Sequence, residues 1–272
     1  MRSRPPLVIV SLHPIFRALT LRLPADQPIY GLSLFDASAL PLPCRLEEIA
    51  AQNAGRLRQL GDGRPLVLAG WCADGVLAYE MAQQLRAVGI AVPLLVLFDS
   101  HNPTAVRRGL WPGRDRFRFH LASVSRLGAA QVLAYARDRV QTLAARLQTK
   151  FWRAGYRRRM YSGPDVDPGL RDPERILSLA VAEYLPQPYP GSVLLVRPES
   201  RPAGRFADPA FGWNELVPHL RTVDVPGNHV EMFREPNVDA MAAALNSVLP
   251  EIGSGFAGSK PSLAARAATV AG

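Results

Sequence analysis

The sequence predicts an α/β fold with a mostly parallel, doubly wound sheet. Short aliphatic runs alternate with helical patterns along most of the 272 residues. One of these runs, residues 94–98, is apolar at every position, which is typical of a strand buried on both faces. Alternating strands and helices form parallel sheets, and such sheets hold their functional sites at the carboxyl ends of the strands.

Each element is predicted from its local pattern. The expected strands are residues 7–10, 28–32, 65–69, 94–98, 193–196 and 222–225. The expected helices cover residues 46–60, 76–88, 175–184 and 236–249, and Gly89 is a plausible C-terminal cap for the second. Apolar residues recur at three- and four-residue steps between Arg114 and Tyr161, which predicts two or three further helices inserted after the fourth strand.

We therefore expect one domain over residues 1–252, with a lid insertion at about 101–172 and a disordered tail at 253–272. No stretch approaches the roughly 18 apolar residues of a membrane span, and no signal-peptide pattern opens the chain, so a cytoplasmic location is the default. Two cysteines, Cys44 and Cys72, exclude a disulfide framework, and neither has metal-ligand spacing.

The net charge of +9 is concentrated in one segment. Residues 107–159 hold 14 Lys or Arg against Asp115 and Asp138, a net +12, which leaves about −3 for the remainder. This distribution argues against a diffuse nucleic-acid surface. A basic lid could steer an acidic partner, although solvated helix faces or a weak contact with an anionic membrane are alternatives.

The chain is organised around Gly70-Trp71-Cys72-Ala73-Asp74-Gly75, which lies between a strand and a helix. A strand, a tight turn and a helix form a nucleophile elbow, in which the central side chain leaves the strand line and faces a helix N-terminus. Cys72 holds the nucleophile position. The glycines do not match a phosphate-binding pattern.

Acyl transfer needs a nucleophile, a base, a group that orients the base, and donors for the oxyanion. Cys72, Asp99 and His229 occur in the chain order of α/β-hydrolase triads, each at a predicted strand end. In this model His229 accepts the thiol proton, Asp99 orients His229, and the Ala73 N–H is one oxyanion donor. The other four histidines fit the role of base less well. His120 and His219 lie in helix-like or surface contexts, and His13 belongs to the loop after the first strand. His101 follows the acid strand too closely to face Cys72.

The chain resembles the thioesterase domains of nonribosomal peptide synthetases and polyketide synthases and their stand-alone relatives. The resemblance covers most of residues 5–250, in these segments: 26–32, the elbow with 79–82, 97–100, 184–191, 208–213 and 226–229. It implies an α/β-hydrolase fold with a helical lid, and the triad Cys72, Asp99 and His229. It also implies acyl thioesters presented on the phosphopantetheine of a carrier protein, and no bound cofactor or metal.

The chain departs from that family at three places. Cysteine replaces the usual serine, so the acyl-enzyme stays a thioester, which favours transfer or capture by an amine or hydroxyl without excluding hydrolysis. Asp74 replaces a glycine, where it either caps the helix or meets an ammonium group of the substrate. The loop after the first strand is short and lacks glycines, and Ile15 is the position implied for the second oxyanion donor.

The sequence thus predicts a thioesterase that releases carrier-bound acyl or peptidyl groups through an S-acyl-cysteine, by hydrolysis or intramolecular capture. Transfer from one carrier to another through the same cysteine is the alternative. A second alternative is a non-catalytic carrier-binding protein, suggested by the altered elbow and the lost glycines.

Overall fold

Six parallel strands form the sheet of the computed structural model, which describes residues 4–33, 35–40, 44–60, 63–108, 151, 154–156, 172–201 and 208–255. The strand order is β2-β1-β3-β4-β5-β6, and each pair of neighbours is parallel. The strands are β1 (Leu7–Ile9), β2 (Ile29–Gly31), β3 (Val67–Trp71), β4 (Leu95–Phe98), β5 (Ser192–Pro198) and β6 (His219–Val225). All six predicted strands are therefore confirmed.

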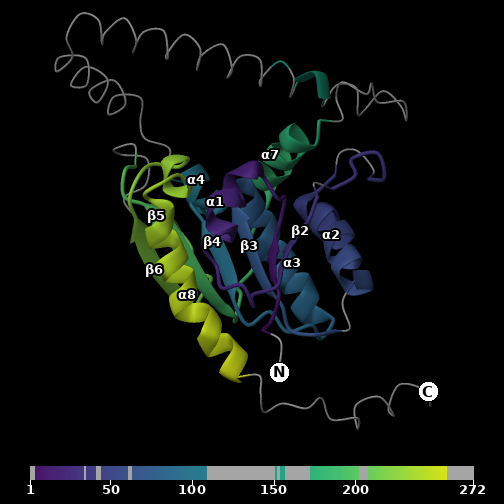
Figure 1. Cartoon of the computed structure of the whole chain (residues 1–272). Coiled ribbons are helices and arrows are strands. Elements are labelled where there is room, and N and C mark those ends of the chain that lie inside the picture. The colour runs from purple at the N-terminus through teal and green to yellow at the C-terminus, as the bar shows by residue number, and fades with distance from the viewer. Residues whose placement is uncertain are drawn as a thin grey trace, which may run out of the picture.

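Helices cover both faces of this sheet (Figure 1). α2 (Leu46–Leu60) packs on α3 (Ala73–Ala87), and α7 (Pro173–Glu183) contacts both. On the other face, α1 (Arg17–Thr20) contacts α8 (Val238–Gly255). A short helix, α4 (Pro103–Arg108), follows β4. The predicted α/β-hydrolase architecture with a doubly wound parallel sheet is thus confirmed.

β4 shows why its sequence is apolar throughout. Leu95 and Leu97 belong to the core beneath α2, α3 and α7, whereas Val96 and Phe98 belong to the core beneath α1 and α8. Successive side chains of a strand point to opposite faces, so a central strand between two helical layers must be apolar at every position.

Two boundary predictions can be compared with the structure. α3 ends before Gly89, whose φ of +83° suits the predicted cap. α8, however, continues to Gly255, past its predicted end at Leu249 and into the predicted tail. Pro250 lies inside this helix, where its φ is compatible with helical backbone but its missing N–H removes one hydrogen bond of the helix. The predicted lid helices between residues 114 and 161, and the tail beyond 255, lie outside the described residues apart from 151 and 154–156.

Candidate active site

The elbow forms at the carboxyl end of β3. Cys72 is the N-cap of α3 and adopts φ +55° and ψ −118°, a strained backbone for a residue with a side chain. Its N–H donates to the Phe98 carbonyl at 2.9 Å, which ties the turn to β4. A Cβ on Gly70 would lie 2.4 Å from the Asp74 carbonyl oxygen, and one on Gly75 would lie 1.9 Å from Ser100 Oγ. The turn is therefore packed too closely for any other residue at these two positions.

Left-handed backbone recurs at the ends of the neighbouring strands. Ser11 follows β1 with φ +54°, and Asp99 follows β4 with φ +43°. Because β1, β3 and β4 are adjacent, Ser11, Cys72 and Asp99 share one edge of the sheet. Strained residues cluster at functional sites when the surrounding fold over-determines their conformation.

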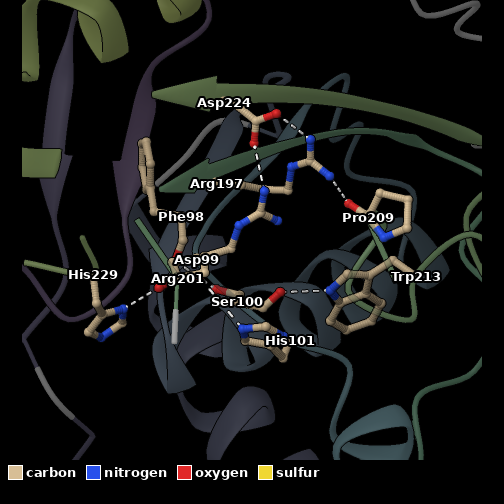
Figure 2. A network of polar contacts seen from close by, with 10 residues as sticks. All are labelled: Phe98, Asp99, Ser100, His101, Arg197, Arg201, Pro209, Trp213, Asp224 and His229. Carbon is tan, nitrogen blue, oxygen red and sulfur yellow. Dashed lines mark hydrogen bonds and ion pairs between the residues drawn. The ribbon is translucent and has the colours of Figure 1, made fainter. Parts of the chain in front are cut away.

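Asp99 meets His229 at this edge, as Figure 2 shows. Asp99 Oδ2 lies 2.5 Å from His229 Nδ1, although the two residues are 130 positions apart. Asp99 is 10% exposed in its side chain. Burial disfavours its charged form, but contacts with His101 and His229 outweigh that effect and hold the pKa of Asp99 at about 2. Asp99 is therefore a carboxylate in the folded protein near neutral pH.

Cys72 is the second partner of His229. Burial lowers the pKa of His229, but the hydrogen bonds to Asp99 and Cys72 and the charges of both groups raise it to about 9. Trp71 stacks on the His229 ring at 4.6 Å, with 28° between the planes. Cys72 is exposed. The structure thus brings the three predicted triad residues together, with an accessible sulfur beside the imidazole.

The two predicted oxyanion donors differ in their present partners. Ala73 is the first residue of α3, so its N–H belongs to the unsatisfied first turn of a helix. The Ile15 N–H instead donates to His13 Nδ1 at 3.1 Å, in a 3-10 helix over Pro14–Phe16. The Ile15 N–H is therefore already hydrogen-bonded in this structure, and its role as the second oxyanion donor stays a prediction.

Asp74 lies in the first turn of α3, two residues after Cys72. Burial raises the pKa of Asp74 to about 7, the nearby Ser11 side chain lowers it somewhat, and the charge of Glu174 raises it. Asp74 Oδ1 and Ser11 Oγ are both buried, and neither has a hydrogen-bond partner of normal geometry among the described residues. The carboxyl group is therefore poorly satisfied in the free protein.

The two cysteines are both free. Cys44 is buried, and burial raises its pKa to about 11, so Cys72 is the accessible thiol. Within the described ranges, no cluster of three or more His, Cys, Asp or Glu is arranged to bind a metal, and no helix is long and apolar enough to cross a bilayer.

Sequence reasoning missed two neighbours of the triad. His101 Nε2 lies 3.6 Å from Asp99 Oδ1, and Trp71 stacks on His229. The position of His101, two residues after the acid at a strand end, was the available signal. Of the other histidines, His13 lies in the loop after β1, as expected, with its ring 6.0 Å from that of Trp71. His219 opens β6 as an exposed residue, within the helix-like or surface contexts expected for it, and His120 is not described.

The sheet order, the elbow and the placement of the acid and histidine define an α/β-hydrolase. The model of the family "Thioesterase domain" matches residues 9–167, more than half of the chain. The chain belongs to the thioesterase domain family. The predicted family is confirmed, and the roles of Cys72, Asp99 and His229 stay predictions.

Relatives in sequence are large synthases. The chain is 37% identical over 86 residues to the non-reducing polyketide synthase ustP of Ustilaginoidea virens, which covers 31% of this chain and 4% of the synthase. It is 33% identical over 107 residues to malpinin synthetase of Mortierella alpina, covering 36% of this chain and 1% of that protein. The chain therefore spans a small part of the length of these relatives.

Two solved thioesterase structures match the fold of this protein over most of the chain. The NocB thioesterase domain, in a covalent complex with a fluorophosphonate nocardicin G analogue, is 26% identical with a TM-score of 0.59. That comparison covers 91% of this chain and 96% of the NocB chain. The RedJ thioesterase of the prodiginine pathway of Streptomyces coelicolor is 20% identical with a TM-score of 0.55, covering 91% and 94% of the two chains, and supports the fold alone.

Proposed function

We propose that this protein is a thioesterase that releases carrier-bound acyl or peptidyl groups through an S-acyl intermediate on Cys72. The observation that carries this proposal is the arrangement of Cys72, His229 and Asp99 at one edge of the sheet, with Asp99 Oδ2 2.5 Å from His229 Nδ1. The relatives in sequence include polyketide synthases and malpinin synthetase. They support a substrate presented as a phosphopantetheine thioester on a carrier protein.

Acylation begins with the transfer of the Cys72 thiol proton to His229 Nε2. His229, with its pKa at about 9, carries that proton at neutral pH, and Asp99 stabilises the resulting imidazolium. The sulfur forms a bond to the thioester carbonyl carbon, and the carbonyl oxygen becomes an oxyanion beside the Ala73 N–H, with Ile15 as second donor. Collapse breaks the bond to the pantetheine sulfur, which takes the proton from His229.

Deacylation runs through the now neutral His229. It removes a proton from water, or from a hydroxyl or amine of the acyl chain itself, as that group attacks the carbonyl carbon of S-acyl-Cys72. Collapse of the second tetrahedral intermediate releases the acid or the cyclised product and returns Cys72 as thiolate paired with the His229 imidazolium. No cofactor enters either step.

Transfer to a second carrier is the alternative that the nucleophile itself favours. The acyl group on Cys72 is a thioester, with nearly the free energy of the incoming carrier thioester. Loading and unloading onto a thiol are therefore both close to reversible. A carrier-protein partner also fits the +12 segment at residues 107–159, since complementary charge accelerates association.

Intact-protein mass spectrometry tests these fates with octanoyl-pantetheine thioester as the probe. An octanoyl adduct that forms on the native chain and on Cys44→Ala, but not on Cys72→Ala, supports the S-acyl intermediate. Loss of the adduct to water supports the thioesterase, whereas its movement to added free pantetheine supports the transferase. The absence of any adduct at Cys72 would contradict both and leave a carrier-binding role.

We further propose that Asp74 contacts the ammonium group of an aminoacyl or peptidyl substrate. Its Oδ1 is buried without a hydrogen bond of normal geometry among the described residues, in the helix turn that follows Cys72, and the Ser11 side chain is the one nearby donor that lowers its pKa. An ammonium group would supply the missing donor and favour the ionised carboxylate.

A comparison of glycyl- and acetyl-pantetheine as probes tests the role of Asp74. Glycyl loading of Cys72 is expected to fall about 10-fold in Asp74→Asn, with acetyl loading nearly unchanged, since hydrogen bonds to charged groups contribute about 1.5–3 kcal/mol. Asp74→Gly is expected to lose the same preference. Equal loss for both probes, or loss for neither, would remove the ammonium contact from the proposal.

A further inference from the structure

A second histidine holds the acid of the candidate triad. His101 Nε2 lies 3.6 Å from Asp99 Oδ1, while His229 Nδ1 lies 2.5 Å from Oδ2 (Figure 2). Each carboxylate oxygen of Asp99 therefore faces a different histidine. His101 has 24% of its side chain exposed, so this contact is largely shielded from solvent.

The His101 ring is held in turn by Phe211. The two rings stack with centroids 3.9 Å apart and 18° between their planes, and Phe211 is 1% exposed. Phe211 has φ +53°, and its carbonyl accepts the Asn102 N–H at 3.0 Å. Asn102 Nδ2 donates to the Gly212 carbonyl at 2.6 Å. The loop after β4 is thus locked to the segment that carries Phe211.

That segment, residues 208–213, is itself anchored at several points. Trp213 Nε1 donates to the Ser100 carbonyl at 2.8 Å. Arg197 donates to the Pro209 carbonyl and to Asp224 Oδ2, the latter at 2.6 Å. Arg201 lies 5.6 Å from the Phe211 ring centroid and 3.6 Å from Asp224 Oδ1. These contacts fix the segment that carries Phe211, and the His101 ring stacks on Phe211; Figure 2 shows the polar contacts of Arg197, Arg201 and Trp213.

We propose that His101 is a positioning residue for the triad, which acts by occupying Asp99 Oδ1 so that Oδ2 stays directed at His229. This inference rests on the proposed function. The carboxylate torsion of Asp is broad and two-fold, so a carboxylate held at one oxygen alone can rotate away from its partner. Asp99 also carries left-handed backbone, and a fixed side chain there keeps the acid, His229 and Cys72 in line.

The test compares His101→Phe, which keeps the ring stacked on Phe211 but lacks the nitrogen, with His101→Gln, which keeps an N–H donor. The rate of Cys72 alkylation by iodoacetamide at pH 7 is measured on the full chain by mass spectrometry. In parallel, proton NMR follows the downfield His229 Nδ1–H resonance. His101→Phe is expected to slow alkylation about 5- to 30-fold and to shift that resonance, because small displacements of a catalytic group carry large rate penalties. His101→Gln is expected to recover most of the rate.

Two results would overturn the positioning role. One is wild-type alkylation and an unmoved resonance in His101→Phe. The other is an equal loss in both variants with a lowered melting temperature, which indicates packing alone.

A His229→Gln variant separates failure of the positioning role from failure of the proposed function. If His229→Gln alkylates as fast as the native chain, His229 does not activate Cys72 and both proposals fail. If His229→Gln is slow and His101→Phe is normal, the positioning role alone fails.

Discussion

The two halves of the candidate site are built differently. At the ends of β4 and β6, Asp99 is held by two histidines, and the loop around it is fixed by buried rings and hydrogen bonds. At the ends of β1 and β3, Ser11 Oγ, Trp71 Nε1 and Asp74 Oδ1 are buried and make no hydrogen bond of normal geometry among the described residues, although the Ser11 side chain lies near enough to lower the pKa of Asp74. The first half has such an atom as well, Arg197 Nε, but it belongs to a side chain that makes two other hydrogen bonds. One half fixes an acid and base, whereas the other leaves groups that a substrate could satisfy.

In the proposed mechanism, the acid–base half activates Cys72, and the nucleophile half decides where the acyl group goes. The acid–base half has the residues that the family resemblance implies, and its contacts lower the pKa of Asp99 and, together with Cys72, raise the pKa of His229. The nucleophile half carries all three departures from that pattern: Cys72, Asp74 and the Ile15 loop. Buried polar groups without good hydrogen bonds are costly, so their presence next to Cys72 agrees with the proposed contact to a substrate.

The largest expected effect on the reaction of Cys72 comes from replacing the acid of the first half, Asp99. In Asp99→Asn the carboxylate that raises the pKa of His229 is lost, so that pKa falls toward its ordinary value and the imidazolium at neutral pH is lost with it. Cys72 acylation and alkylation are expected to slow about 10²- to 10⁴-fold at pH 7. Asp239→Asn, which removes a surface partner of Arg22, is the matched control and should leave both rates unchanged. A native rate in Asp99→Asn would rule out the triad.

A methyl group at the elbow should show how tightly the two halves are joined. Gly75→Ala places a Cβ 1.9 Å from Ser100 Oγ, so α3 must move relative to the acid loop. Overpacking of this kind is expected to cost about 1–3 kcal/mol in the free energy of unfolding, measured with denaturant. Gly55→Ala is the control, because Gly55 also lies in a helix and its Cβ would meet nothing within 4 Å. That change should be neutral or stabilising by up to about 1 kcal/mol. Equal stabilities of the two variants would contradict the close packing.

The smallest expected effect concerns the pH dependence of stability at Asp74. Burial raises its pKa to about 7 in the folded protein from 3.8, so folding is penalised when this group must be ionised. The penalty grows from about pH 4 and is complete above about pH 7. Asp74→Asn should therefore raise the melting temperature more at pH 8 than at pH 5. A gain that is the same at both values would show that Asp74 is solvated in the folded protein.

The sequence by itself determined the framework and the order of the site. Strand and helix periodicity are local properties, so α2 begins and ends where its pattern does, and the doubly buried run at β4 predicts a central parallel strand. Parallel strands place their carboxyl ends at one edge. This is why Cys72, Asp99 and His229 could be expected together from their positions after strands.

The tertiary structure alone decided which side chains surround them. His101 against Asp99, Trp71 against His229 and the Ile15 N–H on His13 depend on backbone angles and ring orientations that local patterns do not specify. Likewise the burial of Asp74, and with it the raised pKa, comes from elements packed around the elbow. The local sequence pattern predicts that a residue lies at an edge of the sheet. Contacts between distant segments of the chain determine its hydrogen-bond partners and its pKa.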